Sequence, residues 1–145
     1  MKGVAVDEAE LLQISLDLPK DSVLVGQTRR TVDSILASAG VDQTCRDDIG
    51  QALGEACANV IKHAELSSNY RVDIALDGDL CTIEVTDDGG GFDPKAVRPG
   101  EELADSGRGL QIVSALVDGL DVVSVDGTGT LLRFTRRLTP RGADR

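Results

Sequence analysis

The 145-residue sequence has few aromatic residues, with no tryptophan, one tyrosine and two phenylalanines. This number is too small for a surface on which nucleic-acid bases stack. The sequence also has no apolar run near the ~18 residues that a membrane-spanning helix needs. Its N-terminus, with Asp7, Glu8 and Glu10, lacks the pattern of a secretory signal. We therefore expect a soluble, cytoplasmic protein that binds neither membrane nor nucleic acid directly.

Cysteine and histidine are also scarce, because the sequence has three cysteines and one histidine. Cys45, Cys57 and Cys81 are widely separated, and none belongs to a Cys-x-x-Cys pair. This pattern argues against a disulfide framework and against a structural zinc site. Because Cys57 and Cys81 occupy apolar positions of periodic segments, we expect buried free thiols.

Basic residues are outnumbered, since 15 Lys and Arg stand against 25 Asp and Glu, for a formal net charge of −10. Residues 133–145 run against this trend, with five arginines and a single acid, Asp144. The rest of the chain is strongly acidic and should repel phosphate backbones, which argues against general nucleic-acid binding. The apolar content of 41% is sufficient for one packed core.

The first part of the chain predicts a strand followed by two helices. Apolar residues alternate strictly over 12–18, as in a strand with one buried face. Asp21 or Ser22 can cap the helix that follows, and Gly40 stands where helices often end in a left-handed residue. A second helix is predicted from about 42 to 64, because its apolar residues recur every three or four positions.

The second part predicts paired strands around a long loop. A hairpin is expected over 72–85, with an Asp-Gly-Asp turn at 77–79. Residues 86–109 are rich in glycine and proline, which is typical of a functional or mobile loop. A third helix over 109–118 and a second hairpin over 122–134 follow. Because strands come in pairs, we expect an α+β fold, a two-layer sandwich with three helices on one face of a mixed, mostly antiparallel sheet of about five strands.

The second predicted helix carries polar residues at a regular spacing. Glu55, Asn59 and His63 follow one another at intervals of four, so they share one helix face. A carboxylate one turn from an amide fits a general base beside a Mg²⁺ ligand, because Mg²⁺ prefers oxygen donors. A solvated helix face explains the same spacing, and we interpret His63 as a structural residue of that face.

A second candidate site follows the strand that ends near Val85. Asp87 comes directly after this strand, and Gly89 and Gly91 follow. A carboxylate fixed at a strand end can accept a hydrogen bond from an exocyclic amine such as that of adenine, and glycines allow a ligand to approach the backbone. An ordinary Asp-Gly turn is the alternative.

Two more glycine-containing segments precede a helix and a strand. Gly107 and Gly109 open the third predicted helix, whose N–H groups and positive dipole end form a natural phosphate site. The turn at 126–129 precedes Thr130, whose hydroxyl could reach a ligand. A loop-to-helix joint and a hairpin turn are the alternatives. The glycines that open the third helix fit neither a Walker A loop nor a dinucleotide fingerprint.

The order of these segments resembles the GHKL family, which has the histidine-kinase-type or Bergerat ATP-binding fold. The N, G1 and G2 boxes of that family correspond here to Glu55-x-x-x-Asn59, Asp87-x-Gly89-x-Gly91 and Gly107-x-Gly109. The resemblance covers nearly the whole chain. Within the family, the chain length and residues 49–64 are similar to the bacterial anti-sigma factor serine/threonine kinases.

The resemblance implies a role for each candidate residue. Glu55 would be the general base that acts on the hydroxyl of a partner, and Asn59 would be the Mg²⁺ ligand. Asp87 would accept a hydrogen bond from the adenine amine. The other nucleotide-binding residues would be Gly89, Gly91, Gly107, Arg108, Gly109, Leu110 and Thr130.

The resemblance also implies an organisation and a function. Residues 1–138 would form one ATP-binding domain with an ATP lid at about 93–108, and residues 139–145 would form a polar tail. Arg29 matches a position at which the family contacts a partner. The protein would be a homodimeric anti-sigma factor that binds a sigma factor. It would use ATP and Mg²⁺ to phosphorylate a serine or threonine of a STAS-type anti-anti-sigma protein.

One position departs from the family pattern. Sporulation-type members carry an arginine directly before the Ser-Gly of the G2 box, where this sequence has Asp105. Lys95, Arg98 or Arg108 could supply the cation instead. The departure keeps a second hypothesis open, in which an ATP-binding regulatory protein sequesters a partner without kinase activity.

Overall fold

The computed structural model describes residues 11–63, 69–87, 107–125 and 129–142. Its elements lie within three residues of the predicted bounds and follow the order β1 (Leu11–Pro19), α1 (Ser22–Ser38), α2 (Gln43–His63), β2 (Asn69–Asp77), β3 (Leu80–Thr86), α3 (Gly107–Leu116), β4 (Gly119–Val125) and β5 (Gly129–Arg137). None of the helices in these ranges is both long and apolar enough to cross a membrane.

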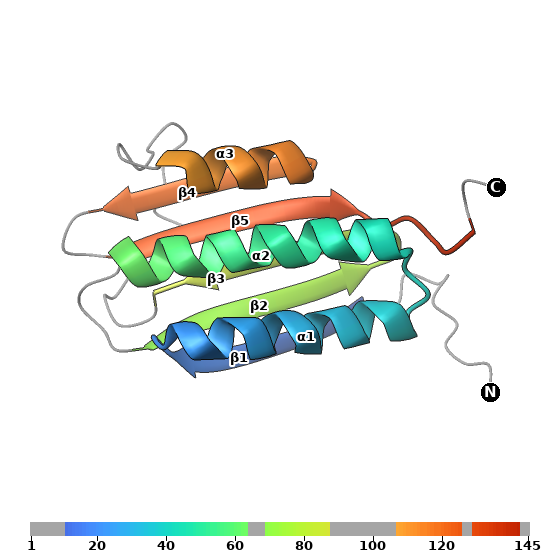
Figure 1. The fold of residues 1–145 in the computed structure, drawn as a ribbon, viewed down its shortest axis with the longest axis horizontal. Helices are drawn as coiled ribbons and strands as arrows, with labels where there is room; N and C mark the ends of the chain where they lie inside the picture. Colours follow the sequence, from blue (N-terminus) through green and yellow to red (C-terminus); the bar gives the residue numbers. More distant parts are fainter. Residues whose placement is uncertain (1–10, 64–68, 88–106, 126–128, 143–145) are drawn as a thin grey trace.

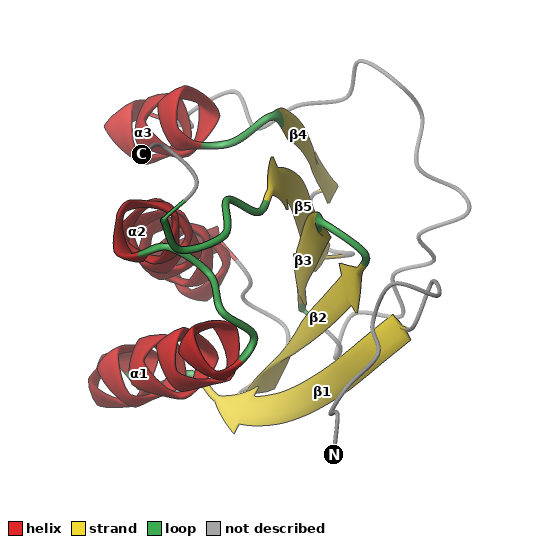
Figure 2. Cartoon of the chain, turned by 90° about the vertical axis from the view of Figure 1, so that its right-hand side faces the viewer, coloured by secondary structure: helices red, strands yellow, loops and turns green. Residues whose placement is uncertain are grey.

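The five strands form one sheet, and the three helices cover one of its faces (Figure 1 and Figure 2). The strand order is β1-β2-β3-β5-β4, and all four neighbouring pairs are antiparallel. This arrangement confirms the predicted two-layer α+β sandwich. The parallel pairing that a mixed sheet would include does not occur among the described strands.

Local sequence explains where the first two helices begin and end. Asp21 caps α1, because its Oδ1 accepts a hydrogen bond from Val23 N at 3.0 Å. Gly40 follows the end of α1 with a φ of 84°, a left-handed conformation that glycine adopts without steric cost. Asp42 Oδ2 then accepts from Thr44 N at 3.1 Å at the start of α2. Such caps are typically worth about 1 kcal/mol each.

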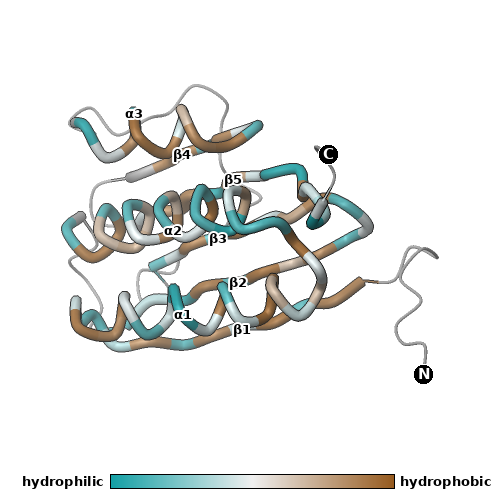
Figure 3. Tube along the Cα trace, turned by 45° about the vertical axis from the view of Figure 1, so that its right-hand side comes forward, coloured by the Kyte–Doolittle hydropathy of each residue, from teal (hydrophilic) through white to brown (hydrophobic). Residues whose placement is uncertain are grey.

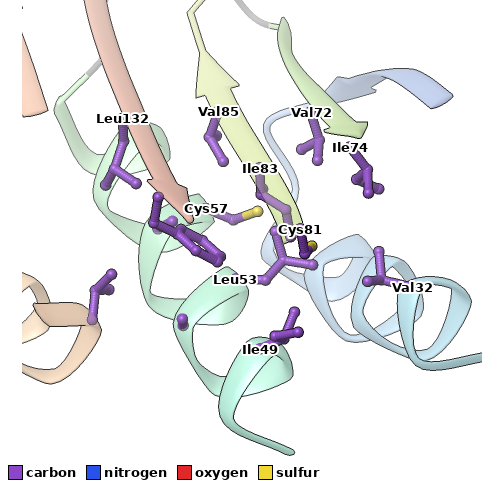
Figure 4. Packing of buried hydrophobic residues seen from close by; sticks show 14 of the residues in the cluster. Val32, Ile49, Leu53, Cys57, Val72, Ile74, Cys81, Ile83, Val85 and Leu132 are labelled. Carbon is purple, nitrogen blue, oxygen red and sulfur yellow. The ribbon is translucent and has the colours of Figure 1, made fainter. Parts of the chain in front are cut away.

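The core lies between the helices and the sheet. One row of paired residues crosses all five strands and consists of Ile14, Ile74, Ile83, Phe134 and Leu120. Ile49, Leu53 and Cys57 of α2 pack against β3 at the centre (Figure 4). In Figure 3, hydrophobic and hydrophilic segments alternate along α1 and α2, as expected for helices with one buried face.

All three cysteines are buried free thiols, which confirms the prediction for Cys57 and Cys81. Burial raises the pKa of the Cys57 thiol from 9.0 to about 11, against a smaller opposite effect of the Tyr70 hydroxyl. Burial, and to a lesser extent Cys45, raises the pKa of Cys81 to about 12. The Cys57 and Cys81 thiols are therefore protonated at neutral pH and act as small apolar core residues.

Most of the arginines near the C-terminus belong to the sheet and are paired with acids. Three of the five arginines lie on β5 and face acids, in the pairs Arg133 with Glu84, Arg136 with Asp48 and Arg137 with Asp79. Because each pair is partly exposed to solvent, it should contribute at most about 1 kcal/mol to stability. Beyond β5, Arg141 N donates to Gly40 O at 2.9 Å, so the start of the predicted tail contacts the connection between α1 and α2.

Candidate functional site

The described site residues lie toward one end of the two layers, on the left in Figure 1. At this end β3 stops, β5 begins, α2 reaches its C-terminus and α3 begins. Asp87 N donates to Thr130 O at 3.0 Å, which joins the end of β3 to the start of β5. Because β3 and β5 are neighbours in the sheet, residues far apart in the sequence meet here.

Glu55, the predicted general base, lies next to the first turn of α3. A carbon at the Cβ position that Gly109 lacks would stand 3.1 Å from Glu55 Oε1, which is closer than ordinary van der Waals contact. The glycine therefore leaves room for the carboxylate at the positive end of the α3 dipole, where an anion is favoured. The N box and the G2 box are thus in direct proximity.

Asn59 lies one turn beyond Glu55, and its side chain is buried. The predicted alternative of a solvated helix face therefore does not hold for Asn59. Its Oδ1 atom has no hydrogen-bond donor within the described part of the chain. An amide oxygen is a ligand that Mg²⁺ accepts, with phosphate oxygens and water as its other ligands. The residues present therefore fit a Mg²⁺ ion held by Asn59 and by nucleotide phosphates.

Asp87, the predicted adenine-binding residue, is fully buried, as is Thr130. Lys20 Nζ lies 3.9 Å from Asp87 Oδ1, and the Lys20 side chain is only 10% exposed. Sequence reasoning missed Lys20, because nothing in its local pattern distinguishes it from a surface lysine. β1 and β3 both pair with β2, which brings the ends of these two strands to the same region.

The glycine pair of the G2 box opens α3, which begins at Gly107 rather than Gly109. The N–H groups of the first turn of a helix have no acceptor within that helix and are available to an anion. The Arg108 side chain is exposed, whereas Leu110 is partly buried against the core. Leu110 thus helps to anchor the start of the helix on the core.

Part of the predicted site lies outside the described residues. This is the case for Gly89 and Gly91 of the G1 box, for most of the predicted lid at 93–108, including Asp105, and for the turn at 126–128. The roles expected for these residues stay predictions, as do those of the described site residues.

Arg29, the predicted partner-binding residue, lies on α1 against α2. Its Cδ atom is 3.2 Å from the Cβ position that Gly54 lacks, and its Nε atom is 3.9 Å from that of Gly50. The two glycines, one helical turn apart, leave room for the arginine side chain, while the residue as a whole stays exposed. Arg29 is therefore held beside the residue that precedes Glu55, a contact that sequence reasoning did not foresee.

The fold and the order of the boxes correspond to a known family. The family described as histidine kinase-like ATPase domain matches residues 18–136. The chain belongs to this family. The match includes all the described candidate residues of this ATPase domain, from Arg29 to Thr130. Membership of the family implies the use of ATP.

Curated relatives of this chain include serine-protein kinases and an anti-sigma factor. This chain is 31% identical over 136 residues to the serine-protein kinase RsbW of Halalkalibacterium halodurans, and the alignment covers 86% of this chain and 83% of the relative. This chain is also 35% identical over 119 residues to the anti-sigma F factor of Thermoanaerobacter sp. (strain X514), and that alignment covers 74% of this chain and 81% of the relative. The expected resemblance to anti-sigma factor kinases is thereby confirmed.

Solved structures support the fold of the ATPase domain. The crystal structure of the RsbU and RsbW domains of a Mycobacterium tuberculosis protein matches with a TM-score of 0.67 and 22% identity, covering 88% of this chain and 32% of that chain. The crystal structure of the SiaB–SiaC complex from Pseudomonas aeruginosa matches with a TM-score of 0.57 and 13% identity, covering 92% of this chain and 93% of that chain. At these identities, the two matches show a shared fold.

Proposed function

We propose that this ATPase domain is an anti-sigma factor and a protein serine/threonine kinase. It binds a sigma factor, and it uses ATP with Mg²⁺ to phosphorylate a serine or threonine of a STAS-type anti-anti-sigma protein. The observation that carries the proposal is the position of the Glu55 carboxylate beside Gly109, one turn from the buried amide of Asn59. The names of the relatives, serine-protein kinase RsbW and anti-sigma F factor, support it.

In the proposed reaction, the two ends of the site have different tasks. Asp87 accepts a hydrogen bond from the exocyclic amine of adenine, and the N–H groups that open α3 bind phosphate oxygens. Glu55 accepts the proton of the acceptor hydroxyl while the hydroxyl oxygen attacks the γ-phosphorus and ADP leaves. Mg²⁺, bound by Asn59 and the phosphates, would neutralise phosphate charge. Phosphoryl transfer depends mainly on positioning and charge neutralisation, so a small site suffices.

A labelling experiment tests the kinase part of the proposal. The purified domain, γ-labelled ATP and candidate STAS proteins should yield a labelled STAS protein. Glu55→Gln should abolish transfer but leave ATP binding within about twofold, because the substitution keeps the shape and removes the base. Glu84→Gln is the matched control, because Glu84 lies on β3 and pairs with Arg133. Transfer by Glu55→Gln at the wild-type rate would exclude Glu55 as the base.

A second function is favoured by one observation, the presence of Asp105 where sporulation-type members carry an arginine. The domain would then bind ATP and sequester a partner without phosphoryl transfer. This function predicts that ATP changes the affinity for the partner while no phosphoprotein forms. Phosphosite mapping on the co-purified partner separates the two functions, because a phosphoserine or phosphothreonine there is expected only of a kinase.

The assembly and its location complete the proposal. We propose that residues 1–138 form the functional domain, with a lid at 93–108, and that the domain is a cytoplasmic homodimer. Arg29 would contact the partner protein, since it is exposed and held against α2 beside Gly54. Light scattering during size-exclusion chromatography should give the mass of a dimer, and a monomer at micromolar concentration would contradict this part.

A further inference from the structure

We propose that Lys20 is a positioning residue that determines how strongly the site prefers adenine. It acts through Asp87, whose carboxylate it faces across the ends of β1 and β3. The inference rests on the nucleotide-binding part of the proposed function and adds a residue to it. Lys20 lies near the proposed base-binding end of the site and acts through Asp87 rather than on the reacting atoms.

Both members of this pair are held in place by the fold. Asp87 directly follows β3, and its N–H group donates to Thr130 O at 3.0 Å. Lys20 stands between the last residue of β1 and the cap of α1, where Asp21 N donates to Pro19 O at 2.8 Å. The positions of the two side chains are therefore set by the sheet and by the turn into α1.

Burial explains why Asp87 needs a cation nearby. The Asp87 side chain is fully buried, and that of Lys20 is 10% exposed. A buried carboxylate without an opposite charge is strongly disfavoured. The distance of 3.9 Å from Lys20 Nζ to Asp87 Oδ1 is longer than the 2.7–3.2 Å of an N–H···O hydrogen bond. The ammonium group therefore stabilises the charge of the carboxylate through space.

The charge of Asp87 matters for the recognition of adenine. A hydrogen bond from an amine to an ionised carboxylate is roughly twice as strong as one between neutral groups. If the ammonium group is removed, the carboxylate loses the charge that faces it at 3.9 Å and turns toward water, which weakens its bond to the exocyclic amine. The loss should concern only nucleotides that carry this amine, because sugar and phosphates bind elsewhere.

Two nucleotides separate this role from a structural one. The dissociation constants of ATP and of purine riboside triphosphate, which lacks the amine, are measured for wild type and for Lys20→Met. Wild type should prefer ATP. In Lys20→Met the affinity for ATP should fall about tenfold, as expected for the loss of one charge-assisted hydrogen bond, while the affinity for the analogue stays within twofold. Lys20→Arg should retain the preference, because it keeps the charge.

Controls make the comparison specific. Lys62→Met removes an exposed lysine of α2 and should leave both affinities unchanged. In an Asp87→Ala background, Lys20→Met should have no further effect on the ratio of the two affinities, because its effect passes through the carboxylate. Lys20→Gln is the second uncharged variant if Lys20→Met does not fold, which thermal unfolding without nucleotide reveals.

The possible outcomes are distinguishable. An equal loss of affinity for both nucleotides in Lys20→Met overturns the inference and leaves Lys20 a structural role. Unchanged affinities in Lys20→Met overturn it as well. If wild type binds neither nucleotide, the proposed function fails together with the inference. If wild type binds ATP but does not distinguish it from the analogue, only the proposed roles of Asp87 and Lys20 fail.

Discussion

Glu55 and Gly109 lie so close that a side chain on the glycine would press on the carboxylate, with 3.1 Å between the absent Cβ and Glu55 Oε1. The proposed base on α2 and the proposed phosphate-binding turn of α3 are thus parts of one arrangement. Any change in the spacing of these two helices alters both. The contact therefore gives a direct test of the site that does not remove any of its polar groups.

Gly109→Ala should uncouple stability from activity. Alanine has a higher helix propensity than glycine by about 1 kcal/mol, so the midpoint of thermal unfolding should stay the same or rise. The displaced carboxylate should lower the rate of phosphoryl transfer about tenfold, because catalysis is sensitive to small misplacements. Gly26→Ala on α1 is the control, since its Cβ would meet Arg30 Nη1 at an ordinary contact distance of 3.7 Å. An unchanged rate in Gly109→Ala would argue against this position of Glu55 in the reaction.

Gly54→Ala should disturb Arg29. The added Cβ would stand 3.2 Å from Arg29 Cδ and 3.4 Å from Nη1, so the arginine has to move. We expect the affinity for the sigma factor to fall about fivefold or more, as when a positioned charged contact is lost. ATP affinity should not change. Gly50→Ala is the matched control, because its Cβ would meet Arg29 Nε at an ordinary 3.9 Å. Calorimetry with the sigma factor and with ATP measures these affinities for both variants. Equal effects of Gly54→Ala and Gly50→Ala would count against the proposed role of Arg29.

Asn59→Ala should remove the dependence of ATP binding on Mg²⁺. In wild type, ATP should bind more tightly with Mg²⁺ than with a chelator, and this ratio should approach one in the variant. The free energy of unfolding without nucleotide should change by no more than about 1 kcal/mol, because the amide oxygen lost has no donor among the described residues. Gln51→Ala, an exposed position of α2, is the control. A ratio like that of wild type would show that Asn59 is not the ligand.

The buried thiols should make the fold less stable at alkaline pH. The pKa of Cys57 is raised from 9.0 to about 11 and that of Cys81 to about 12, so above pH 9 the unfolded chain releases thiol protons that the folded chain retains. Stability from these thiols is complete below pH 9 and declines as the pH rises toward 11. Urea unfolding between pH 7 and 10.5 measures the slope. The variant Cys57→Ala/Cys81→Ala should show a flatter slope, and an equal slope would refute this origin.

Local patterns predicted the elements of the fold well. Strict alternation over 12–18 and three- to four-residue spacing in the helices depend on which face each residue turns to the core. Periodicity does not say which strands are neighbours, and the adjacency of β3 and β5 follows only from the structure. The ion pair of Arg136 and Asp48, which joins β5 to α2, likewise has no sequence signal.

The candidate site likewise has features that short-range sequence predicts and features that only the structure shows. Glu55, Asn59 and Asp87 were predicted because their residue types and spacings carry chemical information within short segments. Sequence reasoning could not predict that Asn59 is buried. It also could not predict that a side chain at Gly54 would crowd Arg29, or that one at Gly109 would crowd Glu55. These features depend on which helix lies next to α2.

The sequence by itself determined the elements, the order of the nucleotide-binding boxes and the family, because each is written in residue type and short-range spacing. Only the tertiary structure decided that Lys20 faces Asp87, that Glu55 lies against Gly109 and that Arg29 lies over Gly54. The physical reason is that these contacts join elements distant in the sequence. Their distances depend on how strands pair and helices pack, and no local propensity encodes that.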